Sequence, residues 1–440
     1  MHDKQNTCKA VKLDLYIFHL TLKMTFKTFT LDAALLNAVS DAAYSQPTEI
    51  QTQAIPLILA KHDVMARAQT GTGKTAAFAL PILQQVLSQK TDTQKLTALV
   101  LTPTRELAQQ VYNSFVAYGK HTDIKIGLAY GGVSVKTQAE IIKSGVNILI
   151  ATPGRLLDHL HTGVLSLVDL EVLVFDEADR MLDMGFKDEI NRILMQTPVA
   201  RQTLLFSATF DKAIYDISKT LLNNAKQIEV ENKNSVVNTV EQTIYVVDAD
   251  RKRELTSYLI GSKNWQQVLV FTRTKKAADD LAKEMCKDGI KTLSIHGDKS
   301  QGARDKALLA FKEGKIRALI ATDVAARGID ISDLYYVINY ELPYQAEDYV
   351  HRIGRTARAG KSGVAVSLLS PGEEWLLEAI EELLATKLLQ QWLPGYEPDM
   401  TKVPSNSTVK GRTQSKKHAR QKALSGDAES KKRKNKRHRR

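Results

Sequence analysis

Short apolar runs alternate with longer helical patterns over most of the chain. A first series of runs rich in β-branched residues lies at 97–101, 147–150, 171–175 and 203–206. After a polar stretch at 231–240, a second series lies at 268–271, 292–295, 318–320 and 336–338. Continuous apolar strands that alternate with helices are typical of parallel sheets covered by helices on both faces. The two series therefore predict two α/β domains joined by a linker.

The two ends of the chain fall outside this pattern. Residues 1–23 match nothing around them, so we expect folding to start near Met24 and interpret the preceding segment as a disordered or mis-assigned extension. Beyond Pro404 the apolar periodicity ends, which is typical of disorder. The expected divisions are a first domain at 24–230, a linker at 231–241, a second domain at 242–395 and a disordered tail at 396–440.

Charge is concentrated in the last part of the chain. Residues 410–440 hold 14 Lys and Arg against two acids, a net charge of +12, which equals the net charge of the whole chain. The remaining 47 basic and 47 acidic residues cancel. Because 410–440 contain no aromatic residue to stack on bases, we expect sequence-independent binding to a polyanion. The alternative is a solvated tail that maintains solubility.

Composition excludes several classes of protein. No run of 18 apolar residues exists, so we expect no membrane-spanning segment. The two cysteines, Cys8 and Cys286, have no metal-ligand spacing and suit a reducing compartment. We therefore expect a cytoplasmic protein, although the run 431–440 also fits a nuclear address.

A glycine-rich loop predicts a nucleotide-binding site. Glycines allow backbone N–H groups to close around phosphate oxygens, and a lysine followed by a hydroxyl residue suits the phosphates and Mg²⁺ of ATP. The strict pattern begins with glycine, whereas this loop begins with alanine; a ligand-free turn is the alternative. The predicted ATP-binding residues of the loop are Ala68, Gln69, Thr70, Gly71, Thr72, Gly73, Lys74 and Thr75.

Two acids end the apolar run at 171–175. Ligands of open α/β sheets bind at the carboxyl ends of strands, which is where Asp176 and Glu177 are expected. Asp176 suits Mg²⁺, together with Thr75, and Glu177 suits orientation or deprotonation of an attacking water. The alternative for Asp176 is to cap the N-terminus of a helix.

A third element adds positive charge. Arg355 and Arg358 are three residues apart, so they share one face of a helix. We expect them to reach the transferred phosphate from the second domain, as arginine fingers do.

Further polar clusters begin at 103, 152, 207, 272 and 322, each close behind a predicted strand. Their hydroxyls and arginines suit a grip on a phosphate backbone without base readout.

The ordered motifs AQTGTGKT, PTRELA, GG at 131–132, TPGR, DEAD, SAT, ATDVAARGID and HRIGRTARAG resemble those of the DEAD-box RNA helicases over roughly residues 26–395. The short body and basic tail are similar to bacterial members of the RhlE type. The resemblance implies two RecA-like domains that face each other across an ATP cleft, with sequence-independent unwinding of short RNA duplexes driven by ATP and Mg²⁺.

The resemblance also implies roles for individual residues. Phe26 would stack on adenine, Gln51 would hydrogen-bond its edge, and Asp330 would hold the ribose. RNA would be held by residues from both domains, namely Arg105, Gly132, Thr152, Arg155, Gln301, Arg304 and Thr322. Nucleotide state would be coupled to strand separation by Asp179, Ser207 and Thr209.

Two positions depart from the family pattern. Ala43 and Ala357 stand where glycine is usual, and both are small enough to leave the expected contacts intact. Glycine matters at such positions where the backbone must approach a neighbour closely.

Three other functions are compatible with parts of the sequence: a DNA translocase, an ATP-gated RNA clamp that serves as an assembly platform, and a non-enzymatic RNA-binding protein. The motifs favour RNA over DNA, and Lys74, Asp176, Glu177 and Arg355 together favour an enzyme. Ribosomal precursors and mRNA-decay complexes are both compatible partners.

Overall fold

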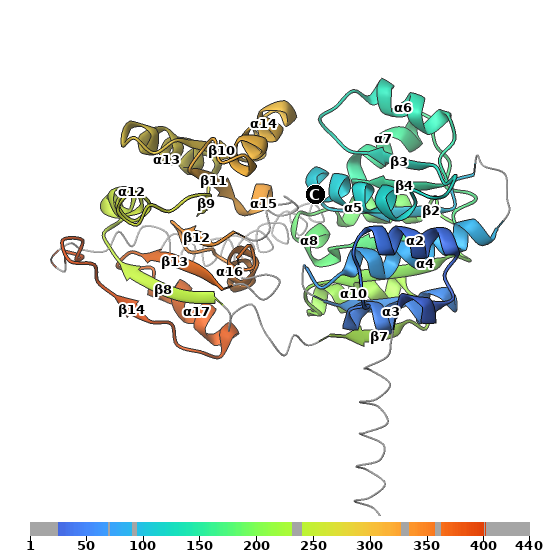
Figure 1. Cartoon of the computed structure of the whole chain (residues 1–440), viewed down its shortest axis with the longest axis horizontal. Coiled ribbons are helices and arrows are strands. Elements are labelled where there is room, and N and C mark those ends of the chain that lie inside the picture. Colours follow the sequence, from blue (N-terminus) through green and yellow to red (C-terminus); the bar gives the residue numbers. More distant parts are fainter. Residues whose placement is uncertain are drawn as a thin grey trace, which may run out of the picture.

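The chain folds around two sheets of seven strands each (Figure 1). The computed structural model describes residues 25–68, 71–89, 95–230, 240–326, 334–356, 362–399 and 401. Every strand pairing within both sheets is parallel, as the continuous apolar runs predicted. None of the described helices is long and apolar enough to cross a membrane.

The first sheet has the strand order β3-β4-β2-β5-β6-β1-β7. Its strands are β1 (Val64–Arg67), β2 (Ala98–Leu101), β3 (Ile126–Ala129), β4 (Ile148–Ala151), β5 (Val172–Asp176), β6 (Gln202–Ser207) and β7 (Lys226–Glu229). β6 lies between β1 and β5, so the loops that follow these three strands meet at one edge of the sheet.

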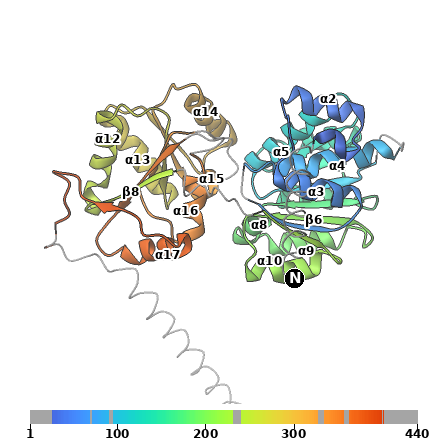
Figure 2. The same ribbon diagram turned by 60° about the horizontal axis from the view of Figure 1, so that its bottom comes forward.

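Helices cover both faces of the first sheet. They are η1 (Phe26–Phe29), α2 (Ala33–Asp41), α3 (Glu49–Leu59), α4 (Lys74–Ser88), α5 (Arg105–Tyr118), α6 (Val135–Lys143), α7 (Pro153–His161), α8 (Ala178–Asp183), α9 (Lys187–Leu194) and α10 (Lys212–Leu221). Figure 2 shows α2 to α5 on one face and α8 to α10 on the other. Each face has its own apolar core.

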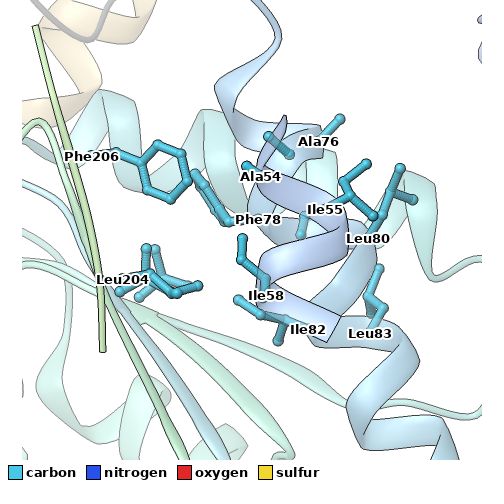
Figure 3. Close-up of a cluster of buried hydrophobic side chains, with 14 of the residues drawn as sticks. Ala54, Ile55, Ile58, Ala76, Phe78, Leu80, Ile82, Leu83, Leu204 and Phe206 are labelled. Carbon is cyan, nitrogen blue, oxygen red and sulfur yellow. The ribbon is translucent and has the colours of Figure 1, made fainter. Parts of the chain in front are cut away.

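The core between α3, α4 and the sheet fixes the start of α4. The Phe78 ring lies 5.2 Å, centroid to centroid, from Phe206 of β6, and Ile58 of α3 packs beside it (Figure 3). All three side chains are fully buried. Because α4 begins at Lys74, this packing holds the first turn of the helix in place against the sheet edge.

The second sheet has the strand order β10-β11-β9-β12-β13-β8-β14. Its strands are β8 (Val240–Val246), β9 (Val268–Thr272), β10 (Thr292–Ile295), β11 (Ala318–Thr322), β12 (Tyr336–Asn339), β13 (Gly363–Leu369) and β14 (Gln390–Gln391). The helices are η2 (Ala249–Arg251), α12 (Lys252–Ser262), α13 (Lys275–Lys287), α14 (Gln301–Lys312), α15 (Asp323–Ala326), α16 (Ala346–Ile353) and α17 (Glu374–Leu384). In Figure 1, α14, α15 and α16 lie on the side that faces the first domain.

Two expected boundaries differ from the structure. Val240 and Glu241, assigned to the linker, belong to β8, whose first half after Val240 is polar (Glu241, Gln242 and Thr243) and therefore shows no apolar run in the sequence. The tail was expected to begin at 396, but the Tyr396 ring lies 4.6 Å from the Arg251 guanidinium, and Asp399 N donates to Asp248. Residues 1–23 and 402–440, with the expected extension and most of the expected tail, lie outside the described residues.

Ala43 occupies a left-handed backbone conformation, with a φ of 55°. This conformation, rather than close approach of a neighbour, explains why glycine suits the position. The left-handed region costs a non-glycine residue about 1–2 kcal/mol. Glycine loses about 0.5–1 kcal/mol more conformational entropy on folding. We therefore expect Ala43→Gly to raise the free energy of unfolding by about 0.5–1 kcal/mol, measured by denaturant titration of the full chain.

The neighbouring alanine provides a matched control. Ala42 has a φ of −76°, which any residue adopts without strain. Ala42→Gly should therefore lower the free energy of unfolding by about 0.5–1 kcal/mol. Changes of the same sign at both positions would contradict backbone strain at Ala43.

Candidate active site between the two domains

The predicted ATP-binding elements converge at the carboxyl edge of the first sheet. β1 leads into the glycine-rich loop, β5 ends at Asp176, and β6 ends at Ser207. Arg67 is in register with Ser207, and Asp176 with Phe206, so the three strand ends lie side by side. The parallel topology therefore collects segments that are about a hundred residues apart in the sequence.

The glycine-rich loop needs its glycines for conformation and for space. Gly71 and Gly73 have φ values of 88° and 90°, in the region that favours glycine. A Cβ on Gly73 would lie 2.4 Å from Gln51 Nε2, which donates to the Gly73 carbonyl at 3.1 Å. Gln51 Oε1 accepts from Thr48 N at 2.9 Å. Gln51 therefore ties the start of α3 to the loop as well as being the predicted adenine contact.

Ala68 takes the place of the expected first glycine without strain. Its backbone N–H donates to Ser207 O at 3.0 Å, which extends the pairing of β1 with β6 by one residue. Its side chain is 1% exposed and lies in the apolar core. Alanine at this position therefore adds buried apolar surface to the core of the first domain.

Two buried charged groups at this edge lack partners among the described residues. Lys74 Nζ and Asp176 Oδ1 have no hydrogen-bond partner there, although Lys74 is 6% and Asp176 3% exposed. Burial raises the pKa of Asp176 to about 6; the Lys74 ammonium lowers this pKa and the Glu177 carboxylate raises it. Buried charges without partners are costly, so this pair suits ligands that bring phosphate oxygens and a cation.

Mg²⁺ fits this donor set. No group of three or more acidic, His or Cys side chains able to hold a metal occurs among the described residues. Mg²⁺ commonly takes one or two protein ligands, with waters and substrate phosphates completing its shell. Asp176 Oδ1 is available as one such ligand, and Thr75 lies at the second position of α4. Asp176 does not act as the helix cap that was the alternative, because Glu177 is the N-cap residue of α8.

Glu177 and Asp179 are held in distinct ways. Glu177 has a φ of 57°, a left-handed conformation that is uncommon for glutamate and often occurs at functional sites. Asp179 Oδ2 accepts hydrogen bonds from Ala208 N at 3.0 Å and Thr209 N at 3.2 Å, while Ser207 Oγ accepts from Thr209 N at 3.3 Å. The three residues predicted to couple nucleotide state to RNA therefore form one hydrogen-bonded cluster.

Glu177 and Arg355 line a single cavity of about 220 Å³ between the domains. The first domain also contributes Asp179, Arg180 and Thr209, and the second contributes residues of α16 and the turn after it. Arg355 is 6% exposed. A base candidate from the first domain and an arginine from the second therefore line the same small cavity.

A second cavity of about 420 Å³ lies where most of the predicted RNA-binding residues meet. Arg105, Thr152, Arg155 and Arg304 line it, and they come from both domains. Gly132, with a φ of 87°, lies beside Arg105, because a Cβ there would be 2.1 Å from Arg105 Nη1. Gln301 Oε1 accepts from the same nitrogen at 3.5 Å, and Thr322 precedes α15, whose Val324 and Ala325 line the cavity.

The arginines of this second cavity are already bound to protein groups. Arg155 Nη1 donates to Gln138 Oε1 at 2.6 Å, and Nη2 donates to Val133 O at 3.1 Å. Arg304 Nη2 lies 2.6 Å from Glu106 Oε1 across the interface between the domains, with both side chains at most 10% exposed. The interdomain pair fixes the position of α14 relative to α5.

Several predicted residues lie elsewhere. Phe26 is 4% exposed, with its ring against Phe29 and Tyr44, so stacking on adenine stays a prediction. The structure does not describe five of the predicted positions, namely Gln69, Thr70, Asp330, Ala357 and Arg358, and their roles stay predictions too.

Sequence reasoning missed Glu106, Gln138 and Arg180. The first and last directly adjoin predicted site residues, whereas Gln138 gave no sequence signal.

Known proteins share this sequence and fold. A family model described as DEAD/DEAH box helicase matches residues 48–217, and one described as Helicase conserved C-terminal domain matches residues 251–360. The DEAD-box ATP-dependent RNA helicase RhpA of Helicobacter pylori is 44% identical over 351 residues, 80% of this chain and 70% of its own length. This chain belongs to the DEAD-box ATP-dependent RNA helicase family. The helicase is also 40% identical over 367 residues to CshA of Bacillus subtilis, covering 83% of this chain and 74% of CshA.

Solved structures of DEAD-box helicases match both domains together. Dbp5 of S. cerevisiae bound to RNA and ADP BeF3 has a TM-score of 0.76 at 30% identity, covering 84% of this chain and 96% of that one. DEAD-box helicase Mss116 bound to ssRNA and UDP-BeF has a TM-score of 0.76 at 28% identity, covering 87% and 83%. These matches confirm the expected pair of RecA-like domains. The narrower resemblance of this helicase to the RhlE type stays a prediction.

Proposed function

We propose that this DEAD-box helicase couples ATP hydrolysis and closure of its two domains to local, sequence-independent unwinding of short RNA duplexes. The observation that carries the proposal is the shared cavity of Glu177 and Arg355. Neither domain holds both groups, so hydrolysis would require the closed arrangement. Coupling closure to chemistry in this way is a common means of gating turnover.

The proposed ATP site assigns one task to each group. The loop at 68–75 binds the phosphates, with Lys74 as the mobile cation. Asp176 and Thr75 would hold Mg²⁺, which neutralises charge on the transferred phosphate. Glu177 orients the attacking water and accepts its proton, and Arg355 stabilises the charge that develops on the phosphate. Arg358 is proposed to assist Arg355.

The proposed RNA site lies across both domains. Arg105, Gly132, Thr152 and Arg155 would hold the backbone from the first domain, and Gln301, Arg304 and Thr322 from the second. Most of these residues meet at the cavity of about 420 Å³, which supports simultaneous contact. ATP and RNA would then favour the same closed arrangement, so the binding of each would strengthen the other. A strand bent by the first-domain contacts would no longer fit a duplex.

The similarity of the described structure to solved structures with bound ligands supports domain closure by ATP and RNA. TM-scores are 0.76 for Dbp5 bound to RNA and ADP BeF3 but 0.58 for a single-residue variant of Dbp5 bound to Nup159, a single-residue variant of Gle1, IP6 and ADP. The described arrangement of the two domains thus resembles the RNA-bound form more than the other form. The proposed setting is the cytoplasm, with ribosomal precursors or mRNA-decay complexes as partners.

Steady-state ATP hydrolysis tests the proposal. Rates should be compared without nucleic acid, with single-stranded RNA and with DNA of the same sequence. Strong stimulation by RNA alone is expected. Equal stimulation by DNA would favour a DNA translocase, because the ribose 2′-OH would then not be read. Good RNA binding without stimulation would favour an ATP-gated clamp or an enzyme that needs a protein activator.

A further inference from the structure

Gln138 is a buried amide that the proposed mechanism does not use. It lies on α6, with 6% of its surface exposed. Its Oε1 accepts a hydrogen bond from Arg155 Nη1 at 2.6 Å, and its Nε2 donates to Tyr130 O at 3.1 Å. A guanidinium can only donate and a carbonyl can only accept, so these two neighbours fix which way the amide points. A carboxamide serves both partners, whereas a carboxylate of the same size could serve only the first.

The loop between β3 and α6 is held at both of its ends. Gln138 binds the carbonyl of the first loop residue, Tyr130, and Arg155 Nη2 donates to the carbonyl of Val133 at 3.1 Å. Because Gln138 also binds Arg155, the two side chains and the loop form a closed ring of hydrogen bonds. Gly132, which is predicted to hold RNA, lies within this ring. Two predicted RNA contacts, Gly132 and Arg155, are therefore attached to one amide.

The Arg155 guanidinium is held mainly by neutral groups. Both of its hydrogen-bond acceptors, the Gln138 amide and the Val133 carbonyl, carry no charge. Asp158 Oδ2 lies 3.4 Å from Arg155 Nε, but the Asp158 side chain is 60% exposed, so solvent screens this pair. His159 Nε2 lies 3.4 Å from Gln138 Oε1, and burial lowers the pKa of His159, which favours the neutral imidazole. Arg155 therefore lines the cavity of about 420 Å³ as a cation whose position is fixed without a carboxylate clamp.

We propose that Gln138 is a positioning residue for RNA binding, which sets Arg155 and the loop around Gly132 in their binding geometry before RNA arrives. Without the amide, the Arg155 side chain would gain freedom and the loop would lose one of its two attachments. RNA binding would then have to order both, and ordering side chains and loops at an interface reduces affinity. The inference rests on the proposed function, since it takes Arg155 and Gly132 as contacts of RNA.

Q138M tests this role in the full chain. Methionine keeps the approximate length of the side chain but offers no donor and only a weak acceptor. The dissociation constant for single-stranded RNA should rise by about tenfold, and the RNA concentration that gives half-maximal ATP hydrolysis should rise with it. The maximal rate at saturating RNA and the ATP affinity without RNA should stay as in the wild type, because the ATP site is unchanged.

The dependence of RNA affinity on salt separates lost positioning from lost charge. Q138M keeps every cation, so the slope of its RNA affinity against salt concentration should match that of the wild type. Q138E keeps an acceptor for Arg155 but adds a negative charge beside it and loses the donor to Tyr130 O. Its RNA affinity should also fall, and its slope should decrease by about one, as in R155Q. The same decrease in slope in Q138M would overturn the positioning role.

Two further variants sharpen the result. Q196M makes the same substitution at an exposed position of the first domain, where the amide donates to Arg192 O, and should leave RNA affinity unchanged. In an R155Q background, Q138M should cause a smaller loss of RNA affinity than in the wild type, because the residue that it positions is already altered. An equal loss in both backgrounds would overturn Arg155 as the positioned group.

The failure of this inference is distinguishable from failure of the proposed function. RNA-stimulated hydrolysis in the wild type together with unchanged RNA affinity in Q138M would overturn the role of Gln138 alone. A loss of ATP affinity without RNA in Q138M would indicate a general structural role within the first domain and would also overturn it. The absence of RNA-stimulated hydrolysis in the wild type would overturn the proposed function, whereas the direct measurement of RNA affinity would still decide the role of Gln138.

Discussion

Glu177→Gln is expected to lower the rate of RNA-stimulated ATP hydrolysis by about 10²- to 10⁴-fold, the usual contribution of a general base. Glutamine keeps the size of the side chain and its hydrogen-bonding ability but cannot accept the proton of the attacking water. ATP and RNA binding should persist, because Lys74, Asp176 and the glycine-rich loop are unchanged. Turnover under saturating ATP and RNA, with binding measured separately, gives the result.

An acid at the opposite end of the same strand is the control. Glu171 directly precedes β5, and its side chain is 49% exposed. Glu171→Gln alters a charge on the same element but far along the strand from the cavity, so turnover should be normal. Normal turnover in Glu177→Gln would remove Glu177 from its proposed role.

Arg355→Ala is expected to lower turnover by about 10³- to 10⁵-fold, the range known for arginines that stabilise a transferred phosphate. The arginine belongs to the second domain, whereas the glycine-rich loop belongs to the first. ATP binding in the absence of RNA should therefore change little, and the loss should appear in the maximal rate. Single-turnover hydrolysis at saturating ATP separates the two effects.

Two other arginines show why the position of Arg355 matters. Arg253 is a second-domain arginine with a 40% exposed side chain that pairs with Asp288 away from the cavity, so Arg253→Ala should leave turnover unchanged. Arg352, only three residues before Arg355, is 1% exposed and bound to Asp323, so its loss should unfold the domain locally. A normal maximal rate in Arg355→Ala would contradict its proposed contact with the phosphate.

The apolar pattern predicted the interior of each sheet well. All eight predicted strands are present. Seven of them lie inside a sheet, where parallel strands are buried on both faces and appear as continuous apolar runs, and β10 lies at an edge. The pattern missed the edge strands β3, β7 and β14 and the strands β1, β8 and β13 inside the sheets. β7 has a single buried residue, and the first half of β8 is mostly polar. Strands at or near the edge of a sheet have less to bury, so their sequences carry a weaker apolar signal.

The residues of the candidate site that lie at the ends of neighbouring parallel strands were predictable from the sequence. Asp176 and Lys74 meet because β1, β6 and β5 are neighbours in a parallel sheet, which the motifs and their order implied. Contacts between the domains were not predictable in this way. The pairing of Glu106 with Arg304 and the position of Arg180 depend on how two separate bodies meet. Neither periodicity nor motif spacing carries that information.

The Glu106–Arg304 pair has a consequence for how RNA affinity should depend on salt. A cationic side chain that meets a phosphate normally displaces small ions from the nucleic acid, and the slope of affinity against salt concentration counts those ions. Arg304 instead carries a protein carboxylate 2.6 Å away before any RNA arrives. When an RNA phosphate displaces the Glu106 carboxylate from Arg304, one anion replaces another beside the arginine. The displaced Glu106 carboxylate then attracts cations from solution. The slope of RNA affinity against salt concentration would then indicate the release of fewer ions than the number of arginines that contact RNA.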